Sequence, residues 1–227
     1  MSSIEQAIGH VKTITFDCYG TLIDWRAGVE SAMREIFGGA IIHRMHEVFA
    51  EYIRVEAEVE SGPYQTYRQV LADVVKRLAS RFGAPVSAER AALLAQRLPQ
   101  WEPFVDTTEA LARLKERYRL GVLSNIDRDL FAATAARLGV AFDFVITAED
   151  VGSYKPATGH FARLLEAHAE RDTILHVAQS LYHDGVPSGQ LGLAYAWINR
   201  YKEANEAAVQ PLAEYPDLKS LADVACG

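Results

Sequence analysis

Short runs of apolar and β-branched residues recur along the chain, and the later runs alternate with segments of helical periodicity. The strand-like runs cover residues 12–17, 119–125, 143–150, 173–180 and 194–200. Helical patterns at residues 129–139 and 159–170 separate the second, third and fourth runs. Strands that alternate with helices form a parallel sheet covered on both faces, so the pattern predicts an α/β fold with a parallel sheet flanked by helices.

The stretch from residue 27 to residue 100 has a different pattern, without a strand-like run. Its apolar residues recur at helical spacing over residues 28–37, 41–60, 64–83 and 87–98. A helical block inserted after the first strand is most simply a cap over the sheet. We therefore expect a core formed by residues 1–26 and 101–227 and a helical cap formed by residues 27–100.

Composition and charge restrict the partners that we expect. Hydrophobic residues make up 49% of the 227 residues, which is typical of a protein with a buried core. No apolar stretch approaches the roughly 20 residues of a membrane span, and the N-terminal residues lack a secretion signal, so we expect no membrane partner. The net charge of −7, without a Lys or Arg tract, also predicts no nucleic-acid partner. Only Cys18 and Cys226 are cysteines, which favours a reducing, cytoplasmic setting.

Polar side chains follow the strand-like runs, at the places where strands of a parallel sheet would end. They are Asp17 after the first run, Ser124 and Asn125 at the end of the second, and Gln179, Ser180 and Asp184 at or after the fourth. Lys155 lies in the stretch SYKPATG, which precedes a predicted helix. Ligands of open α/β sheets bind outside the carboxyl ends of the strands, so we expect these side chains to converge on one crevice.

Four motifs, in order along the chain, carry a resemblance to a known family. The motifs FDCYGTLID, LSN, YKP and HVAQSLYHD, the last followed by GLAYAWINR, extend from the first strand to Arg200. This ordered set resembles the haloacid dehalogenase superfamily and, more narrowly, its L-2-haloacid dehalogenase branch. The resemblance implies a Rossmann-like core with an inserted helical cap, and it also implies a homodimer.

The resemblance makes Asp17 the nucleophile. A carboxylate attacks carbon or phosphorus to form a covalent intermediate, which water then cleaves. With an ordinary pKa of about 4, an aspartate is already ionised at neutral pH and needs no activating base. Lys155 would favour the charged form of Asp17 and help to hold an anionic substrate. The alternative is that Asp17 only caps a turn or a helix.

Two departures from the phosphatases of this superfamily point to chemistry without a metal or a proton donor. Phosphatases have an aspartate two residues after the nucleophile as general acid, and this chain has Tyr19 there. A halide leaves without a proton, so a phenol there can line a pocket that excludes water. The alternative is that Tyr19 has only a packing role. Phosphatases also have a magnesium-binding aspartate where this chain has Gln179, and a neutral amide is a poor ligand for a hard cation. We therefore expect no cofactor and no metal, with Asp184 paired to Lys155.

Two adjacent polar residues are candidates for substrate binding. Ser124 and Asn125 resemble the pair that hydrogen-bonds the substrate carboxylate in this family. They also precede a predicted helix, whose N-terminal N–H groups attract anions. The alternative is plain helix capping by Asn125 or Asp127.

Arg54 is the candidate for positive charge on the cap. It aligns with the cap arginine that meets the halide or the carboxylate in the family. A fixed guanidinium there would stabilise the charge that develops on the leaving group. In the alternative, Arg54 lies on a solvated helix face and pairs with Glu51 or Glu58.

Four positions depart from the pattern of the dehalogenase branch and leave the substrate open. They are Phe161, where the family has tyrosine, together with Gln179, Leu181 and His183 near the fourth strand. His183 is either a base that assists the hydrolytic water or a pocket residue. The intact acid, arginine, lysine and serine still support displacement by Asp17.

These features together predict an (S)-2-haloacid dehalogenase-like hydrolase. It would convert a short (S)-2-haloacid to an (R)-2-hydroxy acid through an aspartyl ester on Asp17, with a small anionic carboxylate as substrate. The same nucleophile could instead act on a strained cyclic carboxylate, as in azetidine-carboxylate hydrolases. Two further candidate functions are a magnesium-dependent phosphatase and a non-catalytic regulator in which Asp17 accepts phosphate or binds anions.

Overall fold

A computed structural model describes residues 8–168 and 170–227, and in these ranges six strands form one sheet. The strands are β1 (Thr13–Phe16), β2 (Arg119–Ser124), β3 (Phe144–Thr147), β4 (Ile174–Ala178), β5 (Ala194–Ile198) and β6 (Ala213–Tyr215). Their order across the sheet is β3-β2-β1-β4-β5-β6, and every neighbouring pair is parallel. The expected α/β fold with a parallel sheet is confirmed.

β1 lies at the centre of the sheet, between β2 and β4. Phe16 stands opposite Val122 of β2 and Val177 of β4. All residues of β1 are buried, because helices cover both faces of the sheet. Asp17, the next residue, therefore emerges at the middle of the carboxyl edge.

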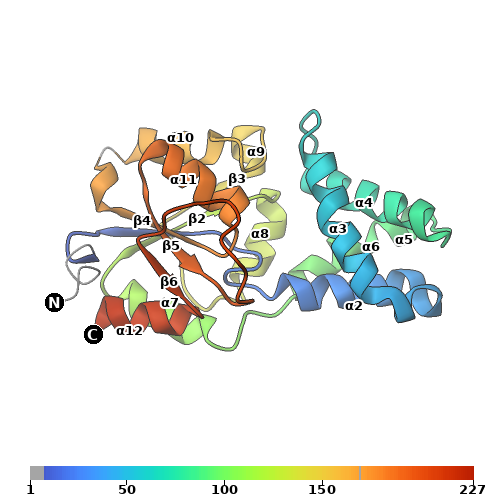
Figure 1. The fold of residues 1–227 in the computed structure, drawn as a ribbon, viewed down its shortest axis with the longest axis horizontal. Coiled ribbons are helices and arrows are strands. Elements are labelled where there is room, and N and C mark those ends of the chain that lie inside the picture. Colours follow the sequence, from blue (N-terminus) through green and yellow to red (C-terminus); the bar gives the residue numbers. More distant parts are fainter. Residues whose placement is uncertain (1–7, 169) are drawn as a thin grey trace.

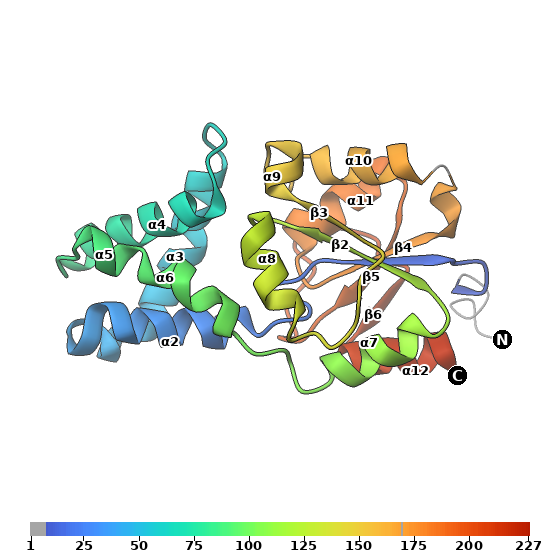
Figure 2. The same cartoon turned by 180° about the vertical axis from the view of Figure 1, so that it is seen from behind.

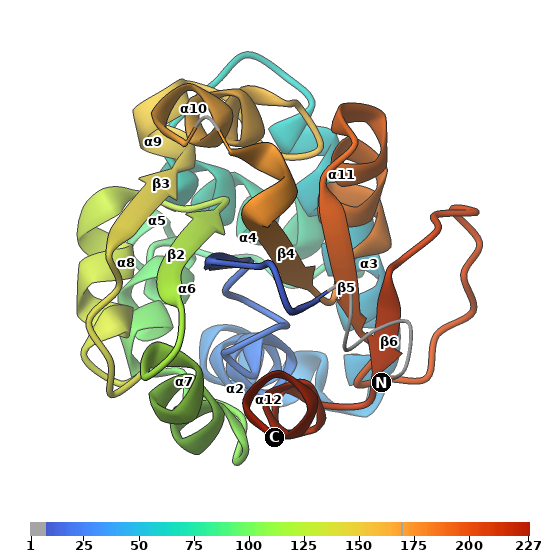
Figure 3. The same cartoon turned by 90° about the vertical axis from the view of Figure 1, so that its left-hand side faces the viewer.

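Helices cover the two faces of the sheet. They are α7 (Thr107–Lys115), α8 (Arg128–Ala135), α9 (Ala148–Val151), α10 (Gly159–Ala167), α11 (Val186–Leu191) and α12 (Leu218–Cys226). Seen along the strands in Figure 3, α7 and α12 lie on one face, and α10 and α11 lie on the other. Leu123 of β2 packs with Phe161 of α10, whereas the adjacent Val122 belongs to the cluster that holds Leu111 of α7. Alternate strand residues thus cover opposite faces, as the pleat of a strand requires.

The helices inserted between β1 and α7 form the cap. They are α2 (Trp25–Phe37), α3 (Met45–Glu60), α4 (Tyr67–Phe82), α5 (Ala88–Ala91) and α6 (Leu93–Arg97). These helices lie to one side of the sheet, beyond the carboxyl ends of the strands (Figure 1). Apolar stripes on α3 and α4 form the inside of the cap, where Val48, Val55, Leu71 and Leu78 are fully buried. The limits of 27 and 100 for this cap stay a prediction; α2 already begins at Trp25.

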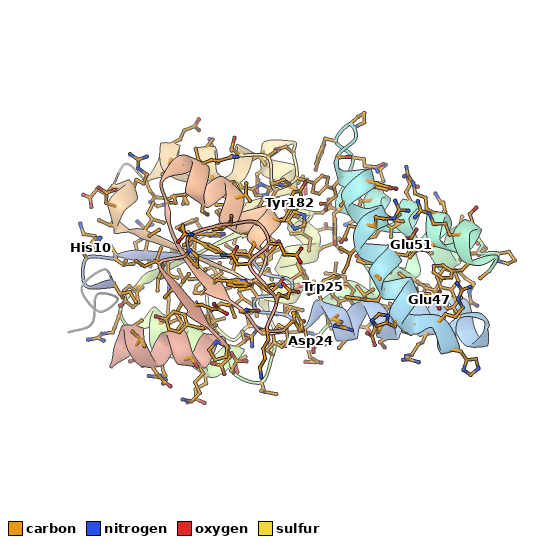
Figure 4. All side chains as sticks on the ribbon, viewed as in Figure 1. His10, Asp24, Trp25, Glu47, Glu51 and Tyr182 are labelled. Carbon is orange, nitrogen blue, oxygen red and sulfur yellow. The ribbon has the colours of Figure 1, made fainter. Side chains whose placement is uncertain are left out.

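Two chain segments cross side by side between core and cap. The Asp24 N–H donates to the Glu102 carbonyl at 2.9 Å, and Ile23 pairs with Pro103. Figure 4 shows Asp24 and Trp25 at this junction. Trp101 packs so closely on α2 that a Cβ added to Gly28 would lie 2.4 Å from its indole ring.

Three short elements differ from the sequence prediction. Residues 148–150, expected at the end of a strand, belong to α9 instead, because Thr147 and Asp150 form a capping box that starts a helix there. The expected 87–98 helix is divided at Ala92 into α5 and α6. β6 was not expected, since three residues give no detectable alternation. None of the helices in the described ranges is long and apolar enough to cross a membrane.

Candidate active site

Asp17 follows β1, and hydrogen bonds fix both of its carboxylate oxygens. Oδ1 accepts from Lys155 Nζ at 2.9 Å, and Oδ2 accepts from Thr21 Oγ1 at 2.8 Å. A tight turn at Gly20, whose φ is 97°, brings Thr21 back to Asp17. The Thr21 hydroxyl in turn accepts from the Gln179 backbone N–H at 2.9 Å. Asp17 is 8% exposed, so a nearly desolvated carboxylate is held in one orientation at the sheet edge.

Lys155 is fully enclosed and joins the two acids of the site. Its Nζ donates to Asp17 Oδ1 at 2.9 Å, to Asp184 Oδ1 at 2.7 Å and to the Leu123 carbonyl at 2.9 Å. Burial lowers the pKa of the ammonium group, but the charges of Asp17 and Asp184 outweigh burial and raise it to about 12. An ammonium group has three donors, and all of them are used here. Lys155 therefore stays charged and fixed between the two carboxylates.

Asp184 is held from two sides and has one oxygen left over. Burial raises the pKa of its carboxyl, but the Lys155 charge, followed by a hydrogen bond from His176, holds it well below its ordinary value. His176 Nε2 lies 2.9 Å from Asp184 Oδ1, and its Nδ1 lies 2.9 Å from Thr15 Oγ1. A carboxylate only accepts, so Nε2 is the donor to Asp184. Asp184 Oδ2 is buried and has no hydrogen-bond partner within the described residues.

Ser124, Gln179 and His183 line the same cavity as Asp17. Ser124 is 1% exposed, and its Oγ has no partner among the residues that the structure describes. Gln179 Nε2 donates to Glu203 Oε2 at 2.8 Å, so its amide N–H group is already engaged. Burial lowers the pKa of His183, which keeps its imidazole neutral at pH 7.

Tyr19 forms part of the cavity wall between core and cap. Its ring meets Trp101 edge-on with centroids 5.9 Å apart, and its hydroxyl bonds Thr134 Oγ1 at 2.8 Å. Burial, followed by the charge of Cys18, raises the pKa of Tyr19 well above 10. The phenol is therefore protonated, and it is already engaged with α8.

Asn125 and Asp127 hold other backbone segments instead of capping α8. Asn125 Oδ1 accepts from the Lys155 N–H at 2.7 Å, and its Nδ2 donates to the Lys155 carbonyl at 3.1 Å. This pair fixes the backbone of the lysine. Asp127 accepts the first two N–H groups of α4, from Tyr67 at 2.7 Å and Arg68 at 3.1 Å. A core carboxylate thus caps a cap helix, and α4 starts against the site.

Arg54 is not brought to the site, which corrects the expectation that it meets the substrate. Its guanidinium pairs with Glu51 at 2.8 Å and with Glu58, on the outer side of α3. The side chain is 52% exposed and does not line the cavity. On α3, residue 54 lies about 200° from residue 56, so it faces away when Glu56 faces the core. Arg54 thus follows the solvated-face alternative.

The cavity lies between the cap and the carboxyl edge of the sheet and has a volume of about 660 Å³. Phe49, Ile53 and Tyr182 give it apolar walls, and Tyr182 lies where the core faces the cap (Figure 4). α8 lies at the side of the sheet nearest the cap (Figure 2). Glu56 and Glu60 of α3 line the cavity from the cap side.

Sequence patterns did not indicate several residues of the site: Thr21, Glu56, Glu60, Asp127 and His176. A helical wheel of α3 carries a usable signal, because Tyr52, Val55 and Val59 mark its buried stripe and the two glutamates flank that stripe. Asp127 has no such signal, because its partners lie 60 residues away.

The residues do not fit a divalent cation at the place where the phosphatases hold one. The Lys155 ammonium occupies the space between Asp17 and Asp184, and the Gln179 amide is bound to Glu203. Within the described ranges, no three His, Cys, Asp or Glu side chains are gathered to hold a metal ion. The chemistry of this donor set favours an ammonium group as the resident cation.

The sheet order, the helical cap after β1 and the acid–lysine–acid cluster define a capped α/β hydrolase. The family model of the haloacid dehalogenase-like hydrolases matches residues 11–179, and the chain belongs to this family.

Relatives and solved structures agree with this assignment. An (S)-2-haloacid dehalogenase of Pseudomonas putida is 27% identical over 203 residues, which cover 86% of this chain and 87% of the relative. A second, (S)-2-haloacid dehalogenase H-109 of the same organism, is 26% identical over 94% of this chain and 97% of its own.

Among solved structures, the L-2-haloacid dehalogenase of Xanthobacter autotrophicus with chloropropionic acid covalently bound has a TM-score of 0.83 at 20% identity. The match covers 96% of this chain and 99% of that one. A HAD-hydrolase of Bacillus subtilis bound to magnesium has a TM-score of 0.78 at 20% identity, over 95% and 98% of the two chains. These two likenesses show the shared fold.

Proposed function

We propose that this protein hydrolyses the carbon–halogen bond of a short 2-halocarboxylate through an ester on Asp17. The observation that carries the proposal is the Asp17–Lys155–Asp184 cluster, with an ammonium group between the acids and with Tyr19 in place of a proton donor. A leaving group that departs as a stable anion suits such a site. The dehalogenase relatives support the same substrate class.

In the first step Asp17 attacks C2 of the substrate opposite the halogen. A bond forms between C2 and a carboxylate oxygen while the C2–halogen bond breaks, so the halide leaves with the electron pair and C2 is inverted. Lys155 and Thr21 hold the carboxylate in one orientation, which favours in-line attack. The free Oγ of Ser124 is available to bind the substrate carboxylate.

In the second step water attacks the ester carbonyl of Asp17. The unpartnered Oδ2 of Asp184 orients this water, and Lys155, which donates to Asp17 Oδ1, stabilises the charge that develops on the carbonyl oxygen. The neutral imidazole of His183 takes the released proton. The products are a 2-hydroxy acid and a regenerated carboxylate, and the hydroxyl oxygen comes from Asp17.

Oxygen-18 labelling under single turnover tests the covalent route. With enzyme in excess over 2-chloropropanoate in labelled water, the label should enter Asp17, and the first product should contain unlabelled oxygen. Label in the first product would show direct attack by water and overturn the proposal. Asp17→Asn serves as the blank for halide release. Homodimerisation and a cytoplasmic setting remain predictions.

A further inference from the structure

The cap presents two acidic side chains to the cavity that the proposed dehalogenation does not use. Glu56 and Glu60 lie one turn apart on α3 and both line the cavity. Glu56 Oε1 accepts from Tyr52 at 2.6 Å and from Tyr67 at 2.8 Å. From the residues that the structure describes, Glu60 receives a single long contact of 3.5 Å, from Asn125 Nδ2. Glu56 is thus held in place, whereas Glu60 has spare acceptor capacity toward the cavity.

Cations near the cavity are already engaged elsewhere. Lys155 donates to its three acceptors, and Arg26 pairs with Glu30 at 3.3 Å while its guanidinium lies 4.8 Å from the centre of the Phe49 ring. Within the described residues, Glu60 has no ion-pair partner at 4.0 Å or less. Among the described residues, no cation is therefore in direct contact with Glu60 on the cap side of the cavity.

Burial makes this arrangement costly for an empty site. Burial raises the pKa of Glu60 well above its ordinary value, the charge of Glu56 adds to the rise, and the charge of Lys155 offsets part of it. The same cause raises the pKa of Glu56. A cationic donor bound between them would relieve this cost, whereas a second anion there would increase it. The buried Ser124 Oγ lines the same cavity, has no partner in the described part of the chain and offers a donor to an anion.

We propose that Glu60, supported by Glu56, selects 2-halocarboxylates that carry a primary ammonium group on the side chain. The substrate would lie with its carboxylate at Ser124 and its ammonium group at Glu60, with C2 toward Asp17. This inference rests on the proposed dehalogenation for the reaction, but the recognition of the ammonium group can be measured without turnover.

Binding of two matched unreactive ligands tests the recognition. β-Alanine and butanoate have the same number of non-hydrogen atoms. β-Alanine has an ammonium group where butanoate has a methyl group. Calorimetry with the full chain should show β-alanine binding at least about tenfold more tightly than butanoate. Glu60→Gln should abolish this preference, while Glu47→Gln, an exposed acid on the same helix, should retain it.

Two results would overturn the inference. One is equal binding of the two ligands to the wild type. The other is that the wild type binds butanoate more tightly than β-alanine and that Glu60→Gln loses this difference. That result would show that Glu60 is protonated and donates to the substrate carboxylate. Circular dichroism of Glu60→Gln, together with retained butanoate binding, controls for loss of the fold.

Halide release from the corresponding substrates separates this inference from the function itself. They are 3-amino-2-chloropropanoate and 2-chlorobutanoate, with Asp17→Asn as the blank for spontaneous reaction of the amine. The wild type should favour the amino compound about tenfold in kcat/KM, and Glu60→Gln should not. Release from both without a preference would refute the inference and leave dehalogenation intact. Preference for β-alanine without any halide release would refute dehalogenation and leave the recognition intact.

Discussion

Replacing Lys155 with methionine removes the charge that holds the two acids of the site together. The change keeps most of the side-chain volume, so the effect comes from electrostatics more than from packing. Asp184 is buried, and Asp17 has a side chain only 12% exposed, so neither gains water in exchange for the lost ammonium group. Removing one partner of a buried ion pair costs about 3–5 kcal/mol. We expect the free energy of unfolding at pH 7 to fall by about 4 kcal/mol.

The loss should become smaller as the pH falls. In the wild type the pKa of Asp184 lies below its ordinary value, so its contribution to stability is present above pH ~4 and is lost only in stronger acid. Without Lys155, burial and the facing Asp17 raise that pKa above its unfolded value, and the folded variant binds a proton that the unfolded chain does not. Stability of the variant then rises by up to about 1.4 kcal/mol for each pH unit below the new pKa, down to about pH 4.

Urea unfolding of both proteins at pH 7 and pH 5, followed by circular dichroism, measures this effect. Lys12→Met is the matched control, because Lys12 pairs with Glu170 at the surface, where both side chains are about two-thirds exposed. That control should cost less than about 1 kcal/mol and show little dependence on pH. A loss in Lys155→Met below 1 kcal/mol, or an equal loss at both pH values, would refute the account of the buried cluster.

Three further outcomes are expected. Gly28→Ala should lower the free energy of unfolding by about 1–3 kcal/mol in urea titrations, because its Cβ would overlap the ring of Trp101; an unchanged value would show that the junction can relax. His176→Leu should reduce kcat about tenfold with KM nearly unchanged and lower stability by about 1.5–3 kcal/mol, because Asp184 loses a charge-assisted hydrogen bond. His176→Gln, which keeps a donor, should recover part of kcat, and no recovery would indicate a role in packing only. Halide release should be insensitive to EDTA and to added magnesium, and loss of activity on chelation would refute the metal-free mechanism.

The core of the site could be predicted from the sequence because it follows from the geometry of a parallel sheet. Asp17 follows β1, Ser124 ends β2 and Asp184 follows β4, and adjacent strand ends meet at one edge. Once the strands were recognised, it therefore followed that these three side chains lie close together. The place of Lys155 in the site could be predicted from the motif YKP, which carries the family resemblance.

The cap side of the site could not be predicted in the same way. Which side of α3 faces the core depends on how the whole helix packs, and a motif position alone placed Arg54 on the wrong side. The engagement of Asp127 with the start of α4 depends on the relative placement of cap and core, which no local pattern encodes. The binding of the Asn125 side chain to the Lys155 backbone is likewise a contact between distant segments.

The side-by-side crossing of the two segments at Asp24 and Glu102 makes the cap a cassette whose ends meet. The sheet register of β1 with β2 and β4 involves no residue of the cap, but Asp127 of the core binds the start of α4, so an exchanged cap would need this carboxylate as well. Under the proposed function, the sheet edge would cleave the carbon–halogen bond and α3 would choose the substrate. A graft of this cassette, together with Asp127, onto a relative's core would then test whether the cap carries ligand selectivity while that core's nucleophile stays unchanged.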